Sequence, residues 1–171
     1  MKKRVIGILI VLWMAVIFLF SAQSAVKSSK VSQSTAYRIA EWQNRVWKQK
    51  KTEQELTAQA ERMQFAVRKG AHMSEYAVLS VLFLLYFMEC SKEVSFFQKN
   101  LSSETKRRRR KIMFLAWGLT VCYAATDEIH QLFVPGRAGR ISDVCIDGIG
   151  ALAGILFIIF LHFPAYFLKK I

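Results

Sequence analysis

Four long apolar segments are the feature that most constrains how this chain can fold. They cover residues 5–22, 71–88, 112–130 and 144–163. About 20 helical residues, each rising about 1.5 Å, cross the hydrocarbon core of a bilayer, and the third segment reaches that length only if its helix continues past Thr126. A soluble domain with 53% hydrophobic residues would interleave them with polar ones, whereas this chain gathers them in blocks. We therefore predict an all-α, polytopic membrane helix bundle with four transmembrane helices.

The first segment also resembles the apolar core of a signal peptide, because Lys2, Lys3 and Arg4 precede it and small residues follow it. The run is bulkier and longer than a usual signal core, since it contains Trp13 and Phe18. Three further apolar segments follow it. We therefore interpret it as a first transmembrane helix.

Basic residues predict the orientation of the chain in the membrane. The run from Lys106 to Lys111 adjoins the third segment, and an even number of crossings puts both termini on its side. Short basic clusters beside a span stay in the cytoplasm. Residues 26–70 are basic as well, but charge in a long loop constrains translocation less. We predict that both termini are cytoplasmic.

The net charge of +13 does not indicate a nucleic-acid partner. The strongest basic run adjoins a predicted span, where anionic lipid headgroups supply the nearest phosphates. We therefore expect the lipid bilayer to be the partner of this charge, and no nucleic acid.

Residues 35–68 lie between the first two spans and have the pattern of an amphipathic helix. Ile39, Trp42 and Val46 are spaced by three and four, and charged or amide residues fill the positions between them. We predict an extracytoplasmic helical segment that either lies on the membrane surface or covers the end of the bundle.

The three cysteines give little indication of function. Cys90, Cys122 and Cys145 are scattered and form neither a pattern of pairs nor a CxxC metal motif. We interpret them as packing residues.

Polar residues gather at one end of each of the last three spans. His72 and Glu75 are three residues apart, a polar run closes the third span, and Asp143 and Asp147 are four apart on the fourth. Because successive spans alternate in direction, these ends meet at the same membrane face. Ionisable residues are costly inside a membrane and normally face a partner or a wet cavity. We therefore predict one shared site.

This site has two groups of candidate residues. The catalytic candidates are His72, Glu75, Asp127, Glu128, His130, Gln131 and Asp143. The candidates for binding a substrate are Lys69, Arg137, Arg140 and Asp147. Among the first group, His130 points away from Glu128 on a helix and is expected to serve an interface.

Several kinds of chemistry fit such a set. Histidine and carboxylates bind divalent metals or act as general acid and base, and an arginine binds phosphate. A purely structural set of interhelical hydrogen bonds and salt bridges is the alternative. No spacing matches a known catalytic motif, so the residues leave the reaction, any metal or cofactor and the oligomeric state undetermined.

Four sequence motifs together resemble the VanZ-like family. They are FLFSAQS at 18–24, RKGAHMSEY at 68–76, TDEIHQLFVPGR at 126–137 and DVCIDGIGALAG at 143–154. The resemblance covers nearly the whole chain and implies one membrane domain of a bacterial protein related to a teicoplanin-resistance determinant. The position of Asp147 is often asparagine in that family, and residues 26–68 form a longer insertion than the motifs require.

The resemblance and the predicted site together suggest a function in the bacterial cell envelope. We expect the protein to bind or modify an envelope component, such as a cell-wall precursor or a lipid headgroup, and so to lower susceptibility to glycopeptide or lipoglycopeptide antibiotics. A non-catalytic scaffold is the main alternative. A small transporter is disfavoured, because the middle of the last three spans offers no titratable groups for a continuous proton path.

Overall fold

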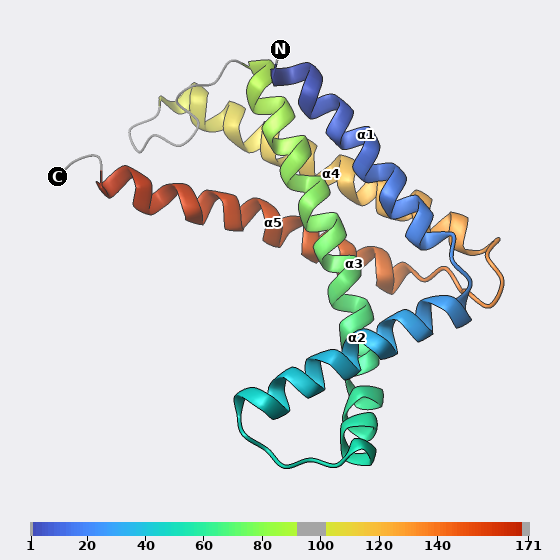
Figure 1. Cartoon of the computed structure of the whole chain (residues 1–171). Helices are drawn as coiled ribbons and strands as arrows, with labels where there is room; N and C mark the ends of the chain where they lie inside the picture. Colours follow the sequence, from blue (N-terminus) through green and yellow to red (C-terminus); the bar gives the residue numbers. More distant parts are fainter. Residues whose placement is uncertain (1, 92–101, 169–171) are drawn as a thin grey trace.

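The computed structural model describes residues 2–91 and 102–168, with side chains to residue 161 in the last helix. Five helices make up this part of the chain: α1 (Lys2–Ser21), α2 (Ala25–Val46), α3 (Glu53–Ser91), α4 (Ser103–Gln131) and α5 (Ile141–Leu168). No strand occurs in the described ranges, which confirms the predicted all-α fold. α1, α3, α4 and Ile141–Leu161 of α5 are long and apolar enough to cross a membrane. Figure 1 shows their arrangement.

The predicted helical segment over 35–68 consists of parts of two helices and begins earlier in the chain than predicted. α2 begins at Ala25 and ends at Val46, and α3 starts at Glu53 and continues without a break through the second span. Each helix has its own start signal. Ser24 accepts a hydrogen bond from the backbone N–H of Lys27, while Thr52 and Glu55 form a reciprocal capping box, with a 2.8 Å bond from Thr52 N–H to the Glu55 carboxylate.

The third span is long enough to cross a bilayer because its helix continues past Thr126, as the sequence required. α4 continues past Thr126 to Gln131, so the polar run of Asp127 to Gln131 lies on the last turns of the helix. The chain then turns through residues 132–140, where Gly136 has a φ of 74°. Such a positive φ strains any residue with a Cβ, which explains glycine after Pro135.

α3 is the central helix and packs most closely against α5. A Cβ at Gly150 would lie 2.8 Å from Met73 Cα, and one at Gly154 would lie 2.9 Å from Ala77 Cα. The backbones therefore approach as the small residues of the fourth span predict.

Polar side chains within the spans bind backbone carbonyls of neighbouring helices. Trp13 donates to the carbonyl of Glu75 at 2.9 Å, and Tyr123 donates to that of Met14 at 2.7 Å. Ser80 donates to the carbonyl of Ala151 at 2.7 Å. Because a bilayer core offers no water, these bonds satisfy groups that would otherwise be costly to bury.

The prediction for the cysteines is wrong. Cys90, Cys122 and Cys145 are all free and exposed. Apolar neighbours along a sequence indicate burial only in a soluble protein, because the outer surface of a membrane bundle is apolar as well.

Candidate functional site

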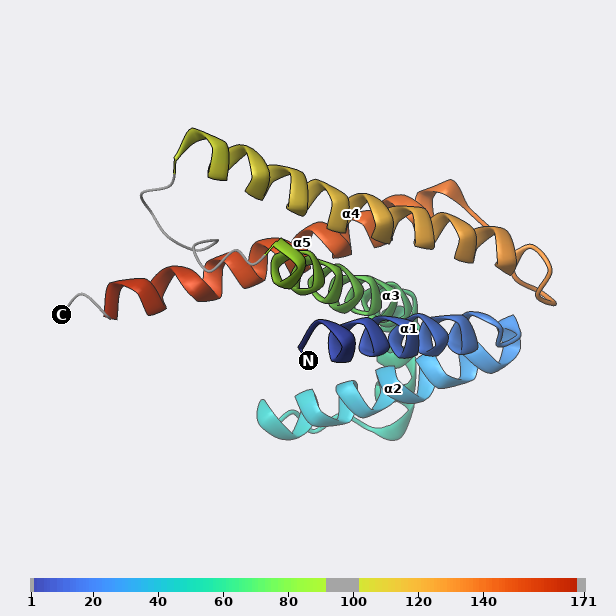
Figure 2. The ribbon, with the colours of Figure 1, turned by 90° about the horizontal axis from the view of Figure 1, so that it is seen from above.

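The predicted polar residues converge at one end of the bundle, which we call the polar end. Here α1 and α4 end, α5 begins and α3 passes through at residues 68–76, and the loop of residues 132–140 closes the end (Figures 1 and 2). The start of α2 joins this loop through a 3.3 Å hydrogen bond from the Ala25 N–H to the Pro135 carbonyl. All five helices therefore contribute to the polar end.

Arg137 connects the loop to the turn between α1 and α2. Its guanidinium donates to the carbonyl of Gln23 at 2.9 Å and to that of Phe20 at 3.3 Å, and a third bond of 3.2 Å reaches the side-chain oxygen of Gln131. Burial lowers the pKa of Arg137, whereas the carboxylates of Asp127 and other acids raise it. The arginine therefore lies among carboxylates and remains a cation at neutral pH.

Asp127, Glu128 and Gln131 form a buried polar layer on α4. The Gln131 amide donates to Asp127 at 3.1 Å and to Glu128 at 2.9 Å. The other oxygen of Glu128 accepts a 2.9 Å bond from the backbone N–H of Arg140. Both oxygens of Glu128 thus hold local structure, and Glu128 fixes the loop against the end of α4.

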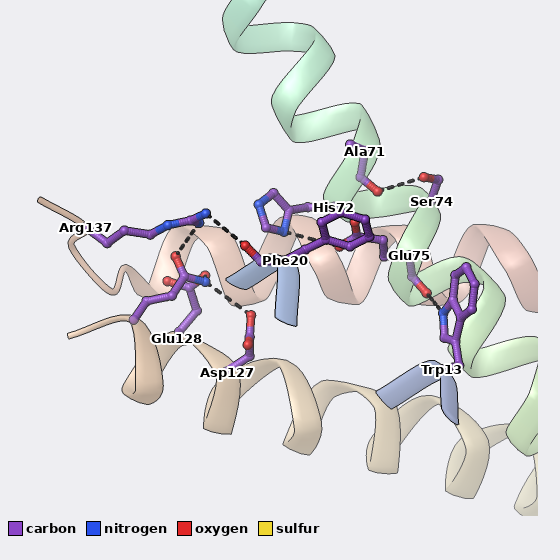
Figure 3. Close-up of polar contacts among 10 residues, drawn as sticks. Trp13, Phe20, Ala71, His72, Ser74, Glu75, Asp127, Glu128 and Arg137 are labelled. Carbon is purple, nitrogen blue, oxygen red and sulfur yellow. Dashed lines mark hydrogen bonds and ion pairs between the residues drawn. The ribbon is translucent and has the colours of Figure 1, made fainter. Parts of the chain in front are cut away.

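α3 brings a second set of groups to the polar end. His72 and Glu75 lie opposite Asp127 and Glu128 (Figure 3), and the His72 Nδ1 is 3.8 Å from the Glu75 carboxylate. Lys69 forms an ion pair with Asp143 at the start of α5, with 2.5 Å between nitrogen and oxygen. This pair ties α3 to α5.

Two of the predicted residues lie apart from these contacts. The ring of His130 packs on the ring of Phe18, with 4.4 Å between centroids, as expected for an interface residue. Asp147 is only 2% exposed and lies one turn deeper on α5 than Asp143.

A pocket of about 380 Å³ opens among α3, the loop and the start of α5. Four cationic side chains line it: Arg68, Lys69, Arg137 and Arg140. Asp143 is the one carboxylate among its lining residues, and it is paired with Lys69. The pocket therefore suits an anion. Asp127 and Glu128 are not among its lining residues, and both accept hydrogen bonds from the Gln131 amide.

The described part of the chain contains no group of three or more histidine, cysteine, aspartate or glutamate side chains arranged to hold a metal ion. The convergence of His72 with the carboxylates therefore does not amount to a metal centre in this geometry.

Arg68 and Tyr76 belong to the polar end but were not among the predicted site residues. Arg68 lines the pocket because α3 continues without a break from its outer part into the span. The Tyr76 hydroxyl is buried and makes no hydrogen bond in the described structure. The sequence indicated both residues only through their positions in the RKGAHMSEY motif, where Arg68 precedes Lys69 and Tyr76 follows Glu75.

The chain was compared with known proteins and families. The family model described as VanZ/LLP1 matches residues 6–162. No curated protein and no solved structure matches. The match spans all four candidate membrane helices and the polar end. The chain therefore belongs to the VanZ/LLP1 family and is a multi-pass membrane protein built from apolar helices.

Proposed function

We propose that this protein binds a phosphate-bearing component of the bacterial cell envelope in the pocket at its polar end, and that this binding lowers susceptibility to glycopeptide or lipoglycopeptide antibiotics. One observation carries the proposal. Four cations line the pocket, and its single carboxylate is neutralised by Lys69. Such a surplus of positive charge in a partly enclosed site favours a phosphate.

The bonding of the four cations divides their roles. Arg137 and Lys69 are already committed to protein partners, with Arg137 bound to the α1–α2 turn and Lys69 paired with Asp143. The side chains of Arg68 and Arg140 supply the other two positive charges of the pocket. An arginine fork binds two phosphate oxygens at once, so these two residues are the best candidates for direct contact.

The topology that agrees with this function places the polar end outside the cytoplasm. Cell-wall precursors and glycopeptides meet on that side of the membrane. Both termini and the basic run from Lys106 to Lys111 then face the cytoplasm, as the distribution of basic residues favours.

A catalytic version of the function rests on His72. Its imidazole lines the cationic pocket, and its Nδ1 lies 3.8 Å from the Glu75 carboxylate. A histidine backed by a carboxylate is a general acid–base arrangement, and here it adjoins the place proposed for the phosphate. Binding without chemistry requires only the cations, so it is the primary proposal.

The test replaces a cation of the pocket and compares it with a cation outside the pocket. Arg68→Gln and Arg140→Gln remove a phosphate contact, whereas Arg62→Gln removes an exposed charge from the same helix α3 without touching the pocket. We expect each pocket variant to weaken binding of glycerol phosphate by roughly ten- to hundredfold, since a charge-assisted bond contributes roughly 1.5–3 kcal/mol.

Binding to the purified full chain is measured by calorimetry, and teicoplanin susceptibility is measured in cells at equal membrane abundance. Arg62→Gln should match the parent in both measurements. Equal binding by all three variants would contradict the proposed site. Altered binding with unchanged susceptibility would separate the ligand from antibiotic resistance.

A further inference from the structure

α2 carries an apolar stripe that no part of the described chain covers. Val31, Trp42 and Val46 are 55%, 61% and 52% exposed, and we call these three residues the α2 stripe. At 100° per residue they fall within about 60° of one another around the helix. α2 meets α3 through a different face, formed by Ser32, Ala36 and Ala40. The stripe is therefore free to contact something outside the chain.

The orientation of α2 follows from its contacts with α3. Gln64 donates to the carbonyl of Ser29, and Gln59 donates to the side chain of Gln43. The two contacts are about 21 Å apart along α2 but only about 8 Å apart along α3. α2 thus crosses α3 obliquely, as Figure 1 shows. A helix that crosses a membrane-spanning helix in this way is placed to lie along the membrane surface.

Val31, at the start of the α2 stripe, faces the membrane-spanning part of the bundle. Val31 lines a second pocket, of about 230 Å³, together with Phe20 at the end of α1 and Ala71 on α3. Phe20 lies near the end of α1, and Ala71 begins the second apolar segment of the sequence. By contrast, Val26 is 68% exposed and lies about 140–160° from the stripe residues, on the opposite side of α2.

Charge on α2 complements a membrane surface. Lys27, Arg38 and Arg45 are exposed and share one strip of the helix, about 20–40° from Val31. An apolar stripe bordered by basic residues is typical of helices that lie in the interface of an anionic bilayer.

The second pocket leads from beneath α2 to the cationic pocket. The two pockets share Arg68, His72 and Arg137 as lining residues. The second pocket therefore brings the apolar side chains of Phe20 and Val31 together with Arg68, Arg137 and the carboxylate of Glu75.

We propose that the ligand of the polar end is a bilayer lipid with a phosphate headgroup, which enters sideways beneath α2. This inference rests on the proposed function, because it assigns the phosphate of that site to a lipid. The headgroup lies among the four cations, while the hydrocarbon stays in the bilayer beside the α2 stripe. α2 thereby holds the entrance at the depth of the headgroups.

The first experiment compares a lipid probe with a soluble probe on the full chain in detergent. Native mass spectrometry measures retention of dioleoylphosphatidylglycerol, and calorimetry measures binding of glycerol phosphate. Val31→Gln should weaken lipid retention by about tenfold, because a polar amide replaces an apolar side chain beside the hydrocarbon. It should leave glycerol phosphate binding unchanged. Val26→Gln is the matched control on the far side of α2 and should change neither.

The possible outcomes separate the two proposals. Equal lipid retention by Val31→Gln and Val26→Gln would overturn entry beneath α2 and leave the phosphate site intact. Glycerol phosphate that displaces the lipid at equal concentration would show that the hydrocarbon contributes nothing, which also overturns the inference. Arg68→Gln should weaken both probes, and its failure to do so would instead defeat the proposed function.

A second measurement does not depend on binding. Val31→Cys or Val26→Cys is introduced into a chain whose three native cysteines are serine, labelled with a fluorophore and placed in phosphatidylcholine–phosphatidylglycerol nanodiscs. Spin-labelled lipid should quench the label at residue 31 and dissolved iodide the label at residue 26. Equal quenching of the two positions by iodide would place the α2 stripe in water and overturn the inference.

Discussion

At the scale of single residues, the polar end is organised by groups that each make several bonds. Gln131 joins Asp127, Glu128 and Arg137 through both ends of its amide. Glu128 accepts one hydrogen bond at each of its two oxygens. Because Asp127, Glu128 and Gln131 are buried, each lost bond leaves an unsatisfied partner. The layer is therefore sensitive to replacements that preserve shape but change donors and acceptors.

Glu128→Gln tests this sensitivity. A glutamine keeps the shape of the side chain but has one acceptor and one donor group, whereas the site requires acceptors facing both Gln131 and the Arg140 N–H. We expect the variant to lower the free energy of unfolding by about 1–3 kcal/mol. Unfolding in detergent measures the change, and Glu61→Gln on the exposed side of α3 should match the parent. A variant with unchanged stability and lost activity would point to chemistry at Glu128.

At the scale of helices, the site depends on how closely α3 approaches α5. Lys69 on α3 pairs with Asp143 on α5, and the same two helices meet closely at Gly150 and Gly154. Their packed backbones leave no room for a Cβ at either glycine, so helix spacing and site geometry are set by the same residues.

Gly150→Ala should therefore be destabilising. The added Cβ would lie 2.8 Å from Met73 Cα, which forces the two backbones apart. Overpacking of this kind costs about 1–3 kcal/mol. Gly118→Ala is the control, because its Cβ would meet no atom within 4 Å. The unfolding midpoint of each variant in detergent measures the difference, and equal destabilisation of both would contradict a specific contact at Gly150.

At the scale of the whole molecule, the basic run before the third span and the polar end lie at opposite ends of the helix bundle. α4 begins in the basic run at one end of the bundle and finishes in the polar layer at the other (Figure 1). The turn of residues 47–52 joins α2 to the outer part of α3, on the side of the bundle where the polar end lies. In a membrane, the basic run at the start of α4 and the turn of residues 47–52 would therefore lie on opposite sides.

Labelling of single cysteines tests this orientation. Lys50→Cys and Ser103→Cys, each in a chain without native cysteines, should react from opposite sides of the membrane with an impermeant maleimide. Position 50 should label in intact cells and position 103 only after the membrane is opened, because basic clusters beside a span remain cytoplasmic. Labelling of both positions from the same side would contradict the four-span topology.

The sequence by itself determined the all-α class, the four apolar helices and the family, since length, apolarity and motifs are local properties of the chain. It also placed His72, Glu75, Asp127 and Asp143 at one end, because alternating spans impose that result. Tertiary structure decided which groups touch. It committed the oxygens of Glu128 to Gln131 and Arg140, added Arg68 to the pocket and left the cysteines on the outside. These outcomes depend on the path of the loop and the crossing of α2 over α3, which join residues far apart in the sequence and leave no periodic pattern along it.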